Sequence, residues 1–185
     1  MKKIEIEIPD GKRAEWVNGV LTLVDNRPKD VTERIKTFED ACAELGNEHP
    51  FVKSYEKYVN IASDEEDEEA DVIAYLKLRI IAAALNEGWK PKFTEDERRW
   101  YPWFKLWTGK ELSDESDEWK ADRHIISTDG YLENYAGFSY AFRVYFTSES
   151  NYSMDSHLCF KSKELTEYCG KQFISLWADF CLIKK

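Results

Sequence analysis

The chain contains few of the residues from which metal sites and nucleophilic centres are built. Three histidines and four cysteines occur among 185 residues, and none has the C-x₂₋₄-C or H-x₃₋₅-H spacing of a structural zinc site. His157 and Cys159 stand two apart on an expected strand, which does not complete such a set. We therefore expect no bound metal, and we interpret the cysteines as reduced core residues, because a free thiol behaves as a small hydrophobe.

The sequence also lacks the motifs that cradle phosphates or activate a nucleophile. It contains no G-x-x-x-x-G-K-[ST], no G-x-G-x-x-G and no G-x-S-x-G pattern. Its 36 acidic residues are so common that no catalytic carboxylate pair can be singled out. The prediction is a non-enzymatic protein without catalytic residues and without a cofactor.

No apolar run is long enough to cross a membrane. The first ten residues, MKKIEIEIPD, lack the hydrophobic stretch of a secretion signal, and Lys77 and Arg79 interrupt the most apolar segment. We therefore expect a cytoplasmic protein that has no membrane partner.

Basic residues are outnumbered by acidic ones, 26 to 36, which gives a formal net charge of −10. Binding to nucleic-acid phosphates depends on Lys and Arg, so we do not expect a nucleic-acid partner, whereas a protein with a basic patch is compatible. Residues 64–71 are the most acidic run and contain no glycine. An EF-hand loop needs a glycine at its centre, so a solvated loop is expected in preference to a Ca²⁺ site.

The apolar segment at residues 71–85 predicts the central helix of the core, because it is hydrophobic on nearly every side. Gly88 and Pro91 follow as stop signals. Thr94 and Glu97 have the spacing of a capping box, which predicts a short helix before Pro102. From Trp103 the pattern alternates, which predicts a strand.

The N-terminal residues predict a small β-meander. Ile4, Ile6 and Ile8 alternate with glutamates, and Asp10-Gly11 and Asn18-Gly19 are turn dipeptides that separate two further strands, at residues 12–17 and 20–24. Asp30 is placed to cap one helix that ends before Gly46, and Pro50 to start a second, with His49 in a capping or packing role.

The C-terminal residues predict two strands and a helix. Residues 138–146 alternate most clearly, and residues 156–161 alternate again, so the segment between them is expected to be a hairpin loop that presents Tyr152. The last helix begins after Ser162 and contains Gly170, which we expect to permit a close packing contact.

These elements predict a single α+β domain over residues 1–185. Its parts are a β-meander (1–28), a helical centre (29–107), an irregular connection (108–136) and a strand hairpin with a terminal helix (137–185).

Aromatic residues make up 15% of the chain and are the most distinctive material for a binding surface. Trp100, Tyr101, Trp103 and Trp107 could form a flat platform, although aromatics that alternate along a strand are more often core. The leading hypothesis is a protein-interaction module that binds a protein partner or self-associates, with Trp103, Trp107 and Tyr152 as contact residues. The alternative is a glycan-binding module that uses the same rings, and the third hypothesis is an acidic mimic of nucleic acid.

Four segments carry a resemblance to a known family: VTERIKTFEDACAELG (31–46), HPF (49–51), AYLKLRIIAAALNEGWKPKFTEDERRWYPWF (74–104) and LCFKSKELTEYCGKQFISLWADF (158–180). Together they resemble a family of small conserved hypothetical proteins from bacterial phages and prophages, for which no activity is assigned. The resemblance implies a cytoplasmic, phage-associated accessory or virion-related protein, and it brings no catalytic or binding residues. Residues 110–134 fit the family least well.

Overall fold

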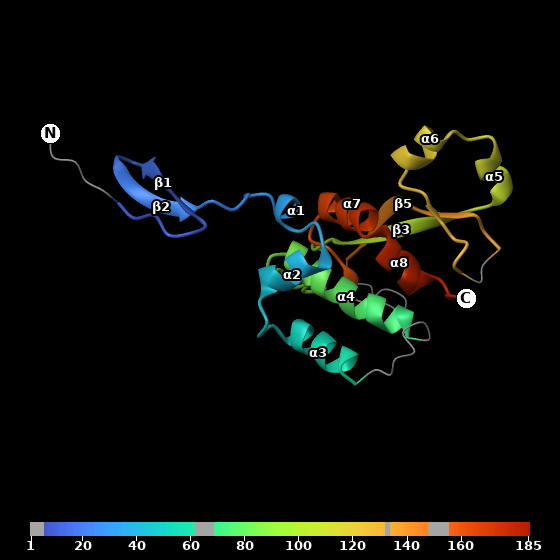
Figure 1. Cartoon of the computed structure of the whole chain (residues 1–185), viewed down its shortest axis with the longest axis horizontal. Helices are drawn as coiled ribbons and strands as arrows, with labels where there is room; N and C mark the ends of the chain where they lie inside the picture. The colour runs from blue at the N-terminus through green and yellow to red at the C-terminus, as the bar shows by residue number, and fades with distance from the viewer. Residues whose placement is uncertain (1–5, 62–68, 132–133, 148–155) are drawn as a thin grey trace.

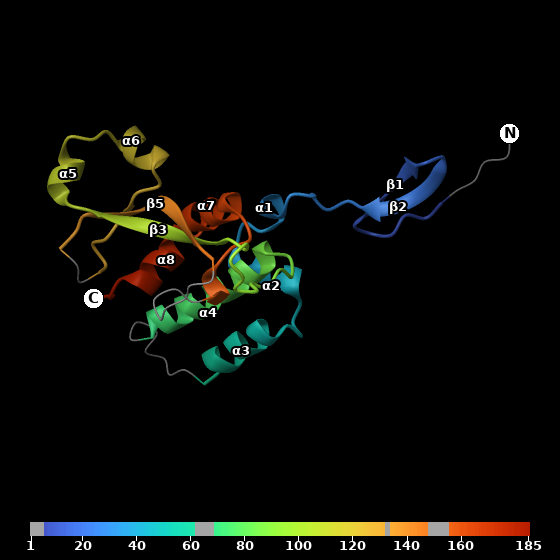
Figure 2. The same ribbon diagram turned by 180° about the vertical axis from the view of Figure 1, so that it is seen from behind.

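The computed structural model describes residues 6–61, 69–131, 134–147 and 156–185. The described chain contains helices and antiparallel sheets, which confirms the predicted α+β class. A two-stranded hairpin near the N-terminus projects away from a body formed by the described residues after residue 30 (Figure 1; Figure 2).

The projecting hairpin consists of β1 (Lys12–Val17) and β2 (Val20–Asp25). Asn18 and Gly19 form its turn with φ values of 50° and 81°, and two positive φ angles match the twist of a tight hairpin. This part of the predicted meander is confirmed. The predicted first strand is not, because residues 6–9 form no strand and residues 4 and 5 lie outside the described chain.

The single helix predicted after Asp30 is wrong, because two helices occupy its place. Asp30 caps the short α1 (Val31–Arg34) by accepting from the Thr32 amide, as predicted, but the chain then leaves the helical conformation at Ile35. Thr37 and Asp40 form a capping box that starts α2 (Phe38–Leu45). Gly46 ends α2 as expected.

The next helix, α3 (Pro50–Val59), starts at Pro50 as predicted, and His49 is its N-cap. It leads through residues outside the described chain to α4 (Ala70–Leu85), which lies at the centre of the body (Figure 1). The prediction of a core helix is confirmed by its buried residues, which are Ala74, Leu78, Ile80, Ile81, Ala82, Ala84 and Leu85. Helices α2, α3 and α8 (Ile174–Cys181) pack around it.

The short helix predicted after Thr94 is also wrong. Residues 95–96 form a turn, and the Glu97 carboxylate accepts from the backbone N–H groups of Lys92 and Phe93 instead of that of Thr94. Strand β3 (Arg99–Trp107) therefore begins earlier than predicted and includes Pro102.

The larger sheet has the order β3-β5-β4, formed with β5 (Gly137–Phe146) and the two-residue β4 (Ile126–Ser127). Strand β5 matches the clearest predicted strand. Helix α7 (Lys163–Gln172) packs on β3 and β5, and α8 follows it after a break at Phe173. The body is thus layered: the sheet, then α7 and α8, then α4 with α2 and α3 beyond it (Figure 2).

Gly170 of α7 confirms the expected close contact. A Cβ at this position would lie 2.4 Å from Cδ2 of Tyr140 and 3.2 Å from Cβ of Pro102. The helix and sheet can approach this closely only because residue 170 has no side chain.

Two further predictions need correction. Residues 156–161 were predicted as a strand, but they form the short 3₁₀ helix η1 (Ser156–Leu158) and a single bridge from Phe160 to Trp100. The predicted irregular connection contains two small helices, α5 (Gly109–Ser113) and α6 (Asp117–Asp122), each opened by a capping hydroxyl from Thr108 or Ser116. No helix in the described ranges has the length and apolar character needed to cross a bilayer.

Candidate functional site

The projecting hairpin has one apolar and one polar face, because residues paired across the two strands point to the same side. Trp16 pairs with Leu21 and Ala14 pairs with Leu23, and these four residues form what we call the apolar face. The opposite face, which we call the polar face because Arg13, Glu15 and Thr22 lie on it, also carries Val17, Val20 and Val24.

The apolar face is open to solvent. Trp16 is 74% exposed, and Leu21 and Leu23 are 37% and 43% exposed, so the described part of the chain leaves this face uncovered. A two-stranded hairpin alone is marginally stable in water, because it has no second layer against which to bury its apolar side chains. We call residues 6–29, which include the projecting hairpin, the arm. The arm therefore presents hydrophobic surface that a binding partner can cover.

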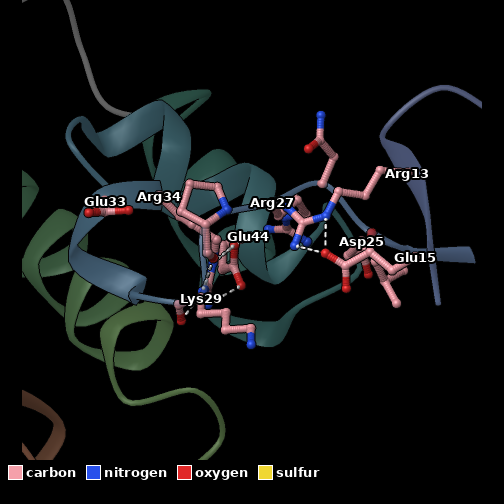
Figure 3. A pocket seen from close by; sticks show the side chains of 11 residues that line it. Arg13, Glu15, Asp25, Arg27, Lys29, Glu33, Arg34 and Glu44 are labelled. Carbon is pink, nitrogen blue, oxygen red and sulfur yellow. Dashed lines mark hydrogen bonds and ion pairs between the residues drawn. The ribbon is translucent and has the colours of Figure 1, made fainter. Parts of the chain in front are cut away.

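The polar face is directed toward the body. Arg13, Glu15 and Val24 from this face line a cleft of about 620 Å³ whose opposite wall includes Glu33 and Arg34 of α1 (Figure 3). The Arg13 guanidinium is paired with Glu15 at 2.7 Å within the hairpin itself. This arrangement turns the indole of Trp16 away from the cleft.

Arg34 anchors the linker between the hairpin and the body. Its Nη1 donates to the carbonyls of Pro28 and Lys29, both at 2.9 Å, and its Nη2 binds Glu44 at 3.2 Å and Glu87 at 2.8 Å. Arg27 adds a second ion pair to Glu44. The hydrogen bond from Arg34 and, to a smaller extent, that from Lys161 lower the pKa of Glu87. The Glu87 carboxylate that binds Arg34 is therefore ionised at neutral pH.

The arm differs from the body in charge. Residues 6–29 contain four basic and four acidic side chains and so have no net formal charge, whereas the whole chain has −10. The excess negative charge therefore lies outside this segment. Next to the apolar face, Lys12 and Asp25 at the end of the hairpin form an ion pair at 3.1 Å.

Two of the predicted contact residues, Trp103 and Trp107, lie on β3 of the body. Trp103 is 48% exposed and stacks on Phe142, with ring centroids 5.9 Å apart and planes at 22°. Trp107 is half-buried: its indole N–H donates to Ser139 and its ring meets Trp119 of α6 edge-on at 5.5 Å. Tyr152 lies outside the described residues.

The flat aromatic platform is not formed. Tyr101 is buried and Trp100 packs against the core, so of the platform residues only Trp103 is markedly exposed. The rings of Trp100 and Tyr101 point to opposite sides of β3, because adjacent residues of a strand alternate between its faces. The structure therefore favours the core interpretation for most of these rings.

The described chain offers no arrangement of His, Cys, Asp and Glu that could hold a metal. The four cysteines are free. Cys159 and Cys169 are buried as expected for core thiols, but Cys42 is only partly buried and Cys181 is exposed, so the core prediction is wrong for Cys181. Burial raises the pKa of Cys159 to about 11 and that of Cys169 to about 12. Both thiols are therefore protonated at neutral pH and unsuited to nucleophilic attack.

Sequence reasoning missed Trp16, Leu21 and Leu23. Their signal was present in the register that the Asn18-Gly19 turn imposes, which places Trp16 opposite Leu21. The sequence analysis assigned these strands to a three-stranded meander. It therefore did not predict that the two-stranded hairpin would stand apart from the body.

Comparison with known proteins gives no relative: no family model, no curated protein and no solved structure matches the chain.

Proposed function

We propose that the protein is a non-enzymatic interaction module that self-associates through the apolar face of its projecting hairpin. The observation that carries the proposal is the exposed Trp16 on an arm that stands apart from the body. An accessory or virion-related role in a phage, as the family resemblance implies, is compatible with a protein that assembles with its own copies.

A second copy is the partner that best fits the chemistry of this face. Two-fold symmetry brings the same patch from each chain together, so the patch has to be self-complementary, and Lys12 and Asp25 give it one charge of each sign. The neutral arm also avoids the repulsion that two acidic bodies would experience in direct contact.

The test is sedimentation velocity of the full chain over a wide concentration range. We expect a concentration-dependent dimer in the wild type. Leu21→Asp, on the apolar face, should weaken the dimer by at least tenfold, which corresponds to about 1.4 kcal/mol. Val20→Asp is the matched control, because it adds the same charge at the neighbouring position on the polar face.

Two outcomes would overturn the proposal. One is a wild-type monomer at every concentration, including a monomer that binds a different protein through Trp16. The other is an equal loss of dimer in Leu21→Asp and Val20→Asp, which would show that the face is irrelevant.

A second candidate function is glycan binding, favoured by the exposed and nearly parallel rings of Trp103 and Phe142. Sugar rings pack on such aromatic faces. Titration with a panel of oligosaccharides should quench tryptophan fluorescence in the wild type and not in Trp103→Ala. Fluorescence that does not respond to any of the glycans would remove this candidate.

A further inference from the structure

A cavity of about 780 Å³ opens on the helical body. Five segments line it: the last residue of α2, the start of α3, the end of α4, the loop at residues 88–93 and η1. Its size falls within the range of pockets that hold small molecules. Most of its lining is apolar, and it includes the rings of Phe51, Trp89 and Phe93.

One wall of the cavity is fixed by contacts among rings. Phe51 meets His49 edge-on at 5.2 Å and His157 at 5.5 Å. The guanidinium of Arg79 lies 4.2 Å from the centroid of the Phe51 ring, a cation–π contact. Because these neighbours hold the Phe51 ring, the wall is formed before any ligand arrives.

The loop at residues 88–93 is held in a strained conformation. Phe93 has a φ of 58°, which is uncommon for a bulky side chain. The Glu97 carboxylate secures the loop through the amides of Lys92 and Phe93, and the Phe93 ring lies 3.9 Å from the guanidinium of the buried Arg99. Strain maintained in this way is typical of ligand sites.

The charged residues that line the cavity are of one sign. Among the described residues, its lining includes Lys90 and no aspartate or glutamate. Three other cavities of the described chain each include at least one carboxylate. The nearby Glu48 is paired with Lys53, and Glu87 is paired with Arg34 and Lys161.

His49 adds a neutral hydrogen-bond donor. Its Nδ1 accepts from the amide of Phe51 at 3.2 Å, so the neutral ring carries its proton on Nε2. Burial, and then the charge of Lys90, lowers the pKa of His49. The imidazole is therefore neutral at pH 7 and offers an N–H.

We propose that this cavity binds a small planar aromatic carboxylate. The aromatic body of the ligand packs between Phe51, Trp89 and Phe93, and its carboxylate lies toward Lys90 and His49. The absence of acidic residues from the described lining disfavours cations, and the small polar fraction of the lining disfavours sugars.

The test is isothermal titration calorimetry of the full chain with naphthalene-2-carboxylate and with its neutral analogue, naphthalene-2-carboxamide. We expect one site per chain that prefers the carboxylate. Lys90→Ala should weaken binding of the carboxylate by roughly threefold, the size of an exposed charge contact. Lys92→Ala is the control, because Lys92 does not line the cavity.

A second variant tests the cavity itself. Ala83→Leu places an added side chain in the cavity from α4 and should abolish binding, while circular dichroism reports whether the fold is retained. The proposal is overturned if the wild type shows no heat of binding, if both analogues bind equally, or if Lys90→Ala and Lys92→Ala weaken binding equally.

Discussion

Gly170 shows how a single missing side chain sets the distance between two layers. An alanine there gains roughly 1 kcal/mol in helix propensity, but its Cβ would collide with the Tyr140 ring at 2.4 Å. We expect Gly170→Ala to lower the free energy of unfolding by about 1–3 kcal/mol, the usual cost of overpacking.

Urea denaturation measures this change. Gly130→Ala is the control, because a Cβ there meets nothing within 4 Å and the backbone has no positive φ. The control should be neutral or slightly stabilising. If Gly170→Ala were as stable as the control or more so, the proposed collision between the added Cβ and Tyr140 would be contradicted.

His49 links the stability of α3 to pH. Burial lowers its pKa in the folded protein below the ordinary value of 6.5, so the unfolded chain binds the proton more readily. The contribution of His49 is therefore fully present above pH 6.5 and is lost as the pH falls from there through the folded pKa.

We expect His49→Asn to reduce the slope of unfolding free energy against pH between about 7.5 and 5, because asparagine keeps the cap without titrating. Urea melts at several pH values provide the measurement. His124→Asn is the control for loss of an imidazole, since asparagine tolerates the φ of 52° at that exposed turn. An equal change in both variants would contradict the role of His49.

At the scale of elements, hydrophobic pattern and capping residues predicted α3, α4, β5 and the hairpin. They failed where a local hydrogen bond competed with the pattern. The capping box of Thr37 and Asp40 divides an apolar stripe that looks continuous, and Glu97 binds the amides of residues 92 and 93 in place of starting a helix. Which backbone amides a side chain such as Asp40 or Glu97 binds depends on the three-dimensional path of the chain, and the periodicity of the sequence contains no information about that path.

Helix α4 is the element on which the body depends. Leu78 is fully buried near its middle, whereas Val72 in its first turn is 36% exposed. We expect Leu78→Ala to cost about 2–5 kcal/mol, because it removes packed atoms and leaves a cavity. Val72→Ala should cost no more than about 0.5 kcal/mol by the same urea measurement. Similar losses at the two positions would contradict the central place of α4.

At the scale of the whole molecule, the sequence did not predict that the hairpin stands alone. Alternation identifies the two faces of a strand, but it does not say which neighbour covers them. The candidate site was missed for the same reason: residues 12–17 were assigned to a strand of a meander without singling out Trp16, whereas the cluster of tryptophans at residues 100–107 led to the choice of Trp103 and Trp107.

Self-association through the arm has a consequence for hydrogen exchange. We expect amide protection in residues 12–25 to rise with protein concentration, because the hairpin is marginally stable until its apolar face is covered. Protection in α4 should not depend on concentration. Mass spectrometry of the exchanging chain measures both regions, and Leu21→Asp should remove the effect from the hairpin. Protection of residues 12–25 that is the same at all concentrations would contradict the dimer.

The edge-on contact between Trp107 of β3 and Trp119 of α6 gives the protein an optical property of its own. Two indole rings 5.5 Å apart and inclined by 83° are close enough for their electronic transitions to couple. Coupled transitions of this kind produce paired bands of opposite sign in circular dichroism. The protein therefore carries an intrinsic spectroscopic reporter of whether the segment at residues 109–122 is docked on the sheet, and no label has to be introduced to observe it.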